Sequence, residues 1–288
     1  MGIIQTLFGH ILKNNMKTIV LTGATSGIGL EVAKELLKQG HRVISSARNM
    51  HKAENIKSEL IKSTKNDAIE FFKTDFADFE SVTHFANQIS EKYDAIDILI
   101  NNAGTWEVTF KETVNGIETN LQVNHLSPML LTLKLIPFLQ KPKNARIINT
   151  SSGAHRRDIL NFDNLEFRQG QYNGVATYSQ SKLLNILFSL ELSERLKQTN
   201  ITVNTVHPGY VQTSLFDKMG ARDWSGIPSA GFGAQSTLYA ALSPDMEGVS
   251  GKYIFINNDD NNLSNLAQDK SIAKRAWDSS MAYIKNYI

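Results

Sequence analysis

The chain has 288 residues, enough for one large α/β domain or two small ones, and 41% of them are hydrophobic, enough to bury a sizeable core. Its 30 basic and 28 acidic side chains leave a formal charge of +2, so no strong field favours nucleic acid or an anionic membrane, and a small molecule is the expected ligand. The lack of cysteine excludes disulfides and thiolate metal sites and fits a reducing compartment, so the cytoplasm is the expected location.

Residues 1–16 form an N-terminal extension with apolar side chains at helical spacing between positions 3 and 12. No apolar run in the chain reaches the roughly 18 residues that a transmembrane helix needs. We expect an amphipathic segment that packs on its own domain or on a partner subunit. The alternatives are weak contact with a membrane surface through residues 3–12 and a lipid anchor, since Gly2 and Thr6 match a myristoylation pattern.

From Lys17 onward, short β-branched runs alternate with helical patterns, as in βαβ units on a parallel sheet. Strands are predicted at 18–22, 42–46, 69–73, 96–101, 146–150, 202–207 and 253–256, and helices at 31–39, 79–93, 119–139, 178–198 and 230–242. No linker or repeat divides the chain. The sequence predicts a single Rossmann-type α/β domain over residues 17–288, doubly wound, with a seven-stranded, mostly parallel sheet and helices on both faces.

Two irregular stretches interrupt this alternation, at 153–177 and 214–233. Long irregular segments in a compact domain are more often functional than not, so both are predicted to be substrate loops. The aromatic side chains in or beside them are expected to form an apolar pocket, or else to pack as the loops' own small cores: Phe162, Tyr172, Tyr210, Phe216, Trp224 and Phe232.

A glycine-rich segment, TGATSGIG at 22–29, lies between the first predicted strand and the first helix. Glycines let the backbone approach a pyrophosphate, and the N-terminus of the following helix favours its negative charge. This order of strand, glycine turn and helix predicts a dinucleotide site rather than an ordinary tight turn. Its predicted binding residues are Gly23, Thr25, Ser26, Gly27, Ile28 and Gly29.

Ala47 and Arg48 follow the second predicted strand, at the position where NAD-selective sites carry an acidic side chain for the ribose 2′-hydroxyl. A guanidinium can bind a 2′-phosphate through charge-assisted hydrogen bonds. Arg48 therefore predicts NADP(H) in preference to NAD(H). The alternative is a solvated surface arginine.

Tyr178 and Lys182 are four residues apart at the start of a predicted helix, so both side chains lie on one face. A nearby ammonium favours the phenolate and lowers the tyrosine pKa, which makes the phenol a usable acid or base. The same spacing also occurs on ordinary solvated helix faces, and only the surrounding motifs distinguish the two.

Those motifs resemble the short-chain dehydrogenase/reductases from about Lys17 to the C-terminus. The matching segments are TGATSGIG at 22–29, Asp75, NNAG at 101–104, Asn124, the serines at 151–152, YSQSK at 178–182 and HPG at 207–209. Within that superfamily the chain is most similar to the retinol-dehydrogenase-like branch. VNHL at 123–126, SSGAH at 151–155, YSQSKL at 178–183 and WDS at 277–279 carry that closer likeness.

The resemblance implies a role for each matching position. Tyr178 would be the acid/base, Ser152 would bind the substrate oxygen, Lys182 would lower the tyrosine pKa and bind the nicotinamide ribose, and Asn124 would support a proton-relaying water. The remaining cofactor contacts would be Asp75, Phe76, Asn102, Ala103 and Gly104 on the adenine side, and Pro208, Gly209, Val211 and Thr213 at the nicotinamide end. Ser151 stays open as the alternative to Ser152.

The implied activity is NADP(H)-dependent hydride transfer between nicotinamide and a small-molecule alcohol or carbonyl. The alternative is a non-catalytic NADP(H)-binding regulator or scaffold that retains the fold. No histidine spacing predicts a metal site. By analogy with the family, the helices that begin near Thr119 and Tyr178 are expected to pair subunits in a homodimer or homotetramer.

Overall fold

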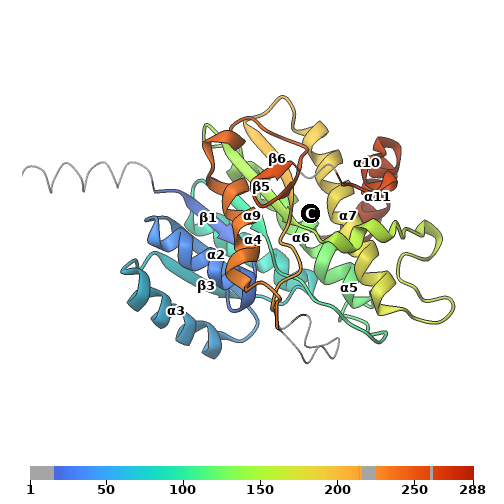
Figure 1. The fold of residues 1–288 in the computed structure, drawn as a ribbon, viewed down its shortest axis with the longest axis horizontal. Coiled ribbons are helices and arrows are strands. Elements are labelled where there is room, and N and C mark those ends of the chain that lie inside the picture. Colours follow the sequence, from blue (N-terminus) through green and yellow to red (C-terminus); the bar gives the residue numbers. More distant parts are fainter. Residues whose placement is uncertain (1–15, 214, 216–224, 260–261) are drawn as a thin grey trace, which may run out of the picture.

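The computed structural model describes residues 16–213, 215, 225–259 and 262–288. It forms the predicted Rossmann-type, doubly wound α/β domain, with helices on both faces of one sheet (Figure 1). The predicted extension at 1–16, and with it the candidate membrane contact at 3–12, lies outside the described residues except for Met16. Among the helices that the structure describes, none is both long and apolar enough to cross a bilayer.

The sheet has eight strands in the order β3-β2-β1-β4-β5-β6-β7-β8. Their bounds are β1 Thr18–Leu21, β2 Arg42–Ala47, β3 Ile69–Lys73, β4 Ile98–Asn101, β5 Ala145–Thr150, β6 Ile201–His207, β7 Tyr253–Phe255 and β8 Asn258–Asp259. The first seven pair in parallel, and β8 pairs antiparallel with β7. The predicted count of seven strands is wrong by this one strand. A two-residue strand is too short for a periodic pattern, and Ile256, with φ +59°, ends β7 in a turn that leads to β8.

Two apolar cores lie on opposite faces of the sheet. One packs under α2 (Gly27–Lys38), α3 (Met50–Thr64) and α9 (Ala230–Leu242). The other packs under α4 (Phe79–Lys92), α6 (Ser127–Leu139), α7 (Gly174–Arg195) and the C-terminal α11 (Lys270–Ile284). Central β4 is buried along its whole length, as its three consecutive aliphatic residues at 98–100 favour.

Two predicted helices differ from the observed ones near the site. The helix predicted at 119–139 is three segments: α5 (Thr119–Leu121), a π-helical turn (Gln122–Leu126) and α6. The helix predicted to open at Tyr178 begins at Gly174, where the Asn173 side chain accepts hydrogen bonds from two N–H groups of the first turn. Tyr178 therefore lies in the second helical turn.

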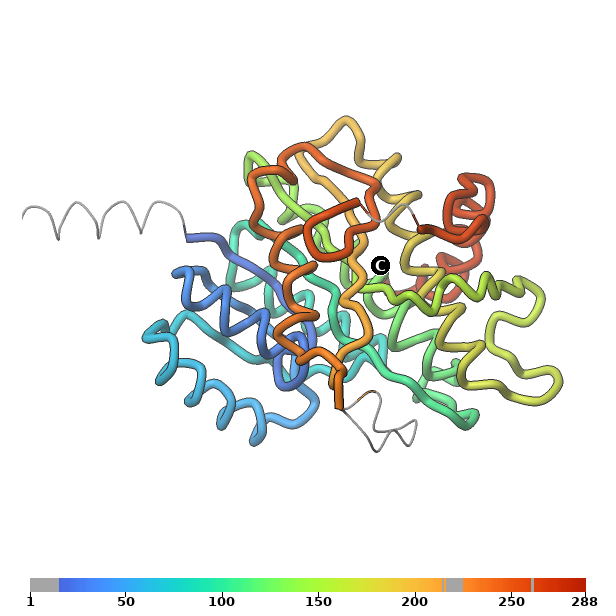
Figure 2. The backbone as a smooth tube through the Cα atoms, in the orientation of Figure 1, coloured from blue at the N-terminus to red at the C-terminus, as the bar shows by residue number. Residues whose placement is uncertain are grey.

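The C-terminal part of the chain packs beside α7. A short helix, α10 (Asn265–Gln268), leads into α11, and Figure 2 shows this last red segment alongside the yellow chain of α7. The Trp277 indole lies under the Arg195 guanidinium at 4.2 Å and stacks on Phe188. As a result, 17 of the 22 residues of α7 are buried, and the helix that carries Tyr178 is held on several sides.

Candidate active site

One cavity of about 370 Å³ follows the carboxyl ends of the parallel strands. It is lined by segments after β1, β2, β3, β4, β5 and β6, including both sides of the β1/β4 boundary where the strand order reverses, the usual ligand site of such sheets. Every predicted site residue lines this cavity except Asn124. The predicted residues that do so are Gly23, Thr25, Ser26, Gly27, Ile28, Gly29, Arg48, Asp75, Phe76, Asn102, Ala103, Gly104, Ser152, Tyr178, Lys182, Pro208, Gly209, Val211 and Thr213.

The turn between β1 and α2 requires glycine for two different reasons. Gly23 has φ +79°, a left-handed conformation that other residues adopt at a cost. At Gly29 a Cβ would lie 2.2 Å from the Gly23 carbonyl oxygen and 2.5 Å from Asn102 Nδ2. The start of α2 therefore packs directly on the turn, and only a residue without a side chain allows it.

This turn is tied to the end of β4. The Thr22 hydroxyl accepts hydrogen bonds from the N–H groups of Asn102 and Ala103 at 3.0 and 2.9 Å, and Asn102 Nδ2 donates to the Thr22 carbonyl. Ser26 precedes α2 without capping it through its side chain. The first N–H groups of α2 thus face the cavity without a side-chain cap, an arrangement that suits a phosphate.

The ends of β2 and β3 form the adenine side of the cavity. Arg48 is exposed, and no ion pair engages it among the residues that the structure describes. The Asp75 carboxylate accepts a hydrogen bond from the N–H of Ala77 at 2.9 Å, so it fixes the turn before α4, while Phe76 is buried in the core. Arg48 is placed to meet an anion at the cavity rim.

At the opposite end of the cavity, the two candidate serines have different partners. The Ser152 side chain lies close enough to Tyr178 to lower the pKa of the phenol, and its hydroxyl accepts a hydrogen bond from the N–H of Ala154 at 3.2 Å. The buried Ser151 hydroxyl donates to the Lys182 carbonyl at 2.7 Å. Of the two serines, Ser152 is the one whose side chain acts on the phenol.

Burial controls the pKa values of both ionisable groups here. It raises the pKa of Tyr178 to about 12, an effect that the nearby Ser152 side chain partly offsets. It lowers the pKa of Lys182 to about 8. The Lys182 ammonium lies 5.6 Å from the centre of the phenol ring and donates to the Thr150 carbonyl at 3.3 Å. The expected lowering of the tyrosine pKa by Lys182 is not found: burial is the largest cause of the shift, and Lys182 is not among the groups that move this pKa.

Asn124 lies behind the cavity wall, in the π-helical turn. Its Oδ1 accepts from the N–H of Thr105 at 2.7 Å, and its Nδ2 donates to the Thr105 carbonyl and to Ser181. A Cβ on Gly104 would lie 3.2 Å from Asn124 Oδ1 and 3.5 Å from Lys182 Nζ, so both side chains converge on that glycine. The Asn124 amide therefore holds the chain after β4 in place. Its position in a π-helical turn is typical of functional side chains on helices.

The two predicted substrate loops relate to the cavity in different ways. None of the described lining residues comes from 153–177, whereas Leu215 of the stretch at 214–233 lines the cavity, and most of that stretch, with Phe216 and Trp224, lies outside the described residues. The last part of the second stretch, from Ala230, belongs to α9. The segments that line the catalytic end instead include Thr105, Glu107, Thr119 and Val123.

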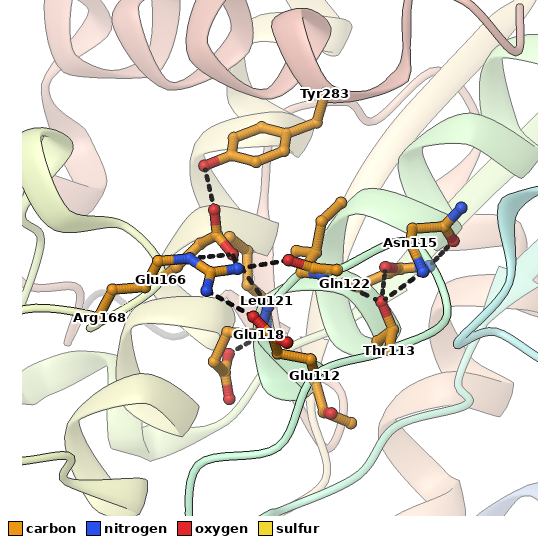
Figure 3. Close-up of polar contacts among 12 residues, drawn as sticks. Glu112, Thr113, Asn115, Glu118, Leu121, Gln122, Glu166, Arg168 and Tyr283 are labelled. Atoms are coloured by element: carbon orange, nitrogen blue, oxygen red, sulfur yellow. Dashed lines mark hydrogen bonds and ion pairs between the residues drawn. The ribbon is translucent and has the colours of Figure 1, made fainter.

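The segment at 153–177 is held in place by polar contacts. Tyr172 donates a hydrogen bond to the buried Glu118 carboxylate at 2.7 Å. Figure 3 shows Arg168 beside Glu166, with Tyr283 of α11 hydrogen-bonded to the same Glu166. This segment is thus anchored to the chain before α5 and to α11.

The sequence motifs missed one aromatic residue at the catalytic end. The Trp106 indole stacks on the Tyr178 ring with 4.2 Å between ring centres and 3° between planes. Its position two residues beyond the NNAG segment was a usable signal, because the chain after β4 borders the cavity. Among the described residues, no group of three or more histidine or acidic side chains could hold a metal ion.

Comparison with known proteins agrees with this geometry. The family model described as short chain dehydrogenase matches residues 17–224. Human retinol dehydrogenase 14 is 36% identical over 287 residues, which covers 92% of this chain and 85% of that protein. Human retinol dehydrogenase 12 is 37% identical and covers 94% of this chain and 89% of that protein.

Solved structures share the fold. An uncharacterised protein from Mycobacterium paratuberculosis is 32% identical with a TM-score of 0.78, covering 93% of each chain. A short chain dehydrogenase from Escherichia coli CFT073, solved with NADPH, is 23% identical with a TM-score of 0.68, covering 88% of this chain and 97% of that one. The chain belongs to the short-chain dehydrogenase family of oxidoreductases, in its retinol-dehydrogenase-like branch.

Proposed function

We propose that the protein is an NADP(H)-dependent oxidoreductase that transfers a hydride between nicotinamide and a small-molecule alcohol or carbonyl, with Tyr178 as the acid/base. The observation that carries this proposal is the single cavity that joins the glycine turn after β1 to Ser152, Tyr178 and Lys182. Fold alone does not define activity, but this set of side chains at one end of a dinucleotide cavity does suit it.

The residues present fit a dinucleotide. The uncapped start of α2 and the glycine turn suit its pyrophosphate, and the rim position of Arg48 suits a 2′-phosphate. An acidic side chain at the end of β2 would favour NAD(H), and Ala47 and Arg48 stand there instead. A bound nicotinamide cofactor supplies or accepts the hydride.

The side chains of the protein itself carry out the proton transfer. In carbonyl reduction, the Tyr178 hydroxyl donates its proton to the substrate oxygen, and in alcohol oxidation the phenolate takes it back. Ser152 hydrogen-bonds the same oxygen and fixes its place beside the phenol. Lys182 places a buried positive charge near the phenol ring and favours the phenolate when it forms.

A substrate panel tests the proposal directly. Aldehydes and ketones are offered with NADPH, and alcohols with NADP⁺, while nicotinamide absorbance is followed, and retinal and retinol are included because related proteins carry the name retinol dehydrogenase. We expect turnover with at least one carbonyl and faster turnover with NADPH than with NADH. NADPH binding without turnover across the panel would favour the non-catalytic regulator or scaffold.

The cytoplasm and a homodimer or homotetramer are further proposals. The cysteine-free composition supports the compartment. For subunit pairing, α11 already covers part of α7, so less of that helix is available than the family analogy implies. Light scattering at several protein concentrations measures the assembly, and a monomeric mass throughout would contradict it.

A further inference from the structure

The ring of Tyr178 is covered by Trp106. The two rings are stacked, with 4.2 Å between their centres and 3° between their planes, and each residue is only 5% exposed. Tyr178 lines the cavity, and Trp106 is not among its lining residues. The indole thus packs on the phenol from outside the cavity.

The backbone on both sides of Trp106 is fixed by asparagine side chains. Asn124 Oδ1 accepts from the N–H of Thr105 at 2.7 Å, and its Nδ2 donates to the Thr105 carbonyl at 2.9 Å. Asn120 repeats the arrangement at Glu107, with distances of 2.8 and 3.0 Å. Both asparagines are buried, so these amide–backbone pairs prescribe where the intervening indole lies.

The helix that carries Tyr178 closely approaches the same chain segment. A Cβ on Gly174, the first residue of α7, would lie 2.6 Å from the Glu107 carbonyl oxygen and 2.6 Å from Val108 Cα. Only glycine permits this approach. The segment with Trp106 and the helix with Tyr178 therefore hold a fixed mutual position.

We propose that Trp106 is a positioning residue for catalysis, whose indole holds the Tyr178 ring so that the hydroxyl faces Ser152 and the substrate oxygen. The inference rests on the proposed function and names a further residue of that site. A phenol free to turn about its side-chain bonds would spend part of its time out of reach of the substrate. Displacement of a reacting group by about 1 Å can lower the rate on the order of 100-fold.

Trp277 offers a matched control. It is also a buried tryptophan stacked on an aromatic ring, at 5.8 Å and 21° from Phe188, but it lies on α11 and does not line the cavity. Loss of either indole removes a similar volume from the core. A role limited to packing predicts similar kinetic effects for the two, whereas a positioning role predicts a difference.

The experiment compares Trp106→Leu and Trp106→Phe with Trp277→Leu in the full chain. For Trp106→Leu we expect kcat to fall about 10- to 100-fold, on the order expected for a misplaced acid. We expect KM and NADPH affinity to change less than about threefold, because the indole does not line the cavity. Trp106→Phe, which keeps a flat ring over the phenol, recovers most of kcat, and Trp277→Leu retains it.

The pH profile supplies a readout that packing alone does not move. Water reaches the phenol in Trp106→Leu, so the pKa of Tyr178 falls from about 12 toward its ordinary value of 10. The phenolate then forms at lower pH, and the acid limb of alcohol oxidation shifts to lower pH while kcat falls. Trp277→Leu leaves that limb in place.

Near-ultraviolet circular dichroism tests the stack without turnover. Trp106→Leu and Tyr178→Leu should each remove the same aromatic band, and the double variant should remove no more. Unchanged kcat and pH limb in a folded Trp106→Leu, equal losses of kcat in Trp277→Leu, or additive band losses would overturn the inference. If Trp106→Leu does not fold, the test rests on Trp106→Phe. A folded Trp106→Phe whose kcat stays far below that of the wild type would then overturn the inference. If the wild-type protein shows no turnover, the proposed function is contradicted instead. The circular dichroism comparison would still test whether Trp106 stacks on Tyr178.

Discussion

The two ends of the cavity are built in different ways. The phosphate end is mostly backbone, from one continuous segment that runs from β1 through Gly23 and Gly29 into α2. The catalytic end is an assembly of side chains from α7 and from the chain after β4 and after β5, such as Thr105 and Lys182, which are 77 residues apart in the sequence. A site built from one continuous segment can be predicted from the sequence. A site whose side chains come from several segments can be seen only in the folded structure.

Gly29→Ala should break the phosphate end and have the largest effect. The added Cβ would overlap the Gly23 carbonyl at 2.2 Å, so the start of α2 must move. We expect NADPH affinity to fall at least about 100-fold, since a shifted helix start loses its phosphate contacts. Isothermal titration of folded protein measures it, with Gly231→Ala as the control, because a Cβ there meets only Ser229 Oγ at 3.6 Å.

Arg48→Ala should weaken NADPH binding about 10- to 100-fold and leave NADH binding unchanged. The estimate follows from about 1.5–3 kcal/mol for a hydrogen bond to a charged group. Titration with both cofactors separates the 2′-phosphate from the shared part of the dinucleotide. Lys52→Ala, on exposed α3, serves as the control. Equal losses for the two cofactors would make Arg48 an ordinary surface arginine.

The catalytic end should respond to pH through Lys182. Its pKa, lowered by burial to about 8, lies far below that of Tyr178 at about 12, so the ammonium loses its proton first as pH rises. We expect kcat/KM for carbonyl reduction to be constant near neutrality and to fall above pH 8, because kcat/KM reports the free protein. Lys182→Arg keeps its charge and should lose this limb. A profile flat to pH 9.5 in the wild type would refute the assignment.

The segment at 153–177 should show the smallest effects, and these separate buried from exposed polar contacts. Tyr172→Phe removes one of the donors to the buried Glu118 carboxylate, which keeps the N–H groups of Asn120 and Leu121, and should lower the free energy of unfolding by about 1–3 kcal/mol. Arg168→Ala removes ion pairs of a side chain that is 42% exposed and should cost about 0–1 kcal/mol. Urea unfolding of both variants tests the order, and a reversed order would contradict it.

The pKa of Glu118 also determines the direction in which its contribution to folding stability changes with pH. Burial raises its pKa above the usual 4.5, so the folded state holds a proton that the unfolded state releases. That contribution is present below the unfolded pKa and is lost as pH rises through the folded value. The Tyr172→Phe comparison is therefore best made at one fixed pH.

The sequence predicted well those features that follow from local patterns. The helix at 230–242 coincides with α9, and the strand at 69–73 coincides with β3. Helix α3 escaped prediction because it is mostly solvated, with only Ala53 and Leu60 buried, so its apolar periodicity is weak. The short β8 and the C-terminal α11 escaped as well, the first because two residues carry no period.

At the site, the motifs predicted many of the residues that line the cavity but not all of their contacts. The choice of Ser152 over Ser151 depends on which side chain lies toward Tyr178. The sequence does not specify this for two adjacent serines, and only the structure distinguishes them. The pKa of Tyr178 depends on burial from several segments at once, which a four-residue spacing does not contain. Trp106 contacts Tyr178 because the fold brings the chain after β4 next to α7, and no local sequence pattern contains that contact.

The most direct test of the account is to measure kcat and the NADPH dissociation constant together in Tyr178→Phe, with Tyr283→Phe on α11 as the matched control. If the two ends act separately, kcat should fall about 10²- to 10⁴-fold, the usual worth of a general acid, while NADPH affinity stays within about threefold of wild type. Tyr283→Phe should retain both values. Turnover that persists in folded Tyr178→Phe would contradict the assignment of Tyr178 as the acid/base.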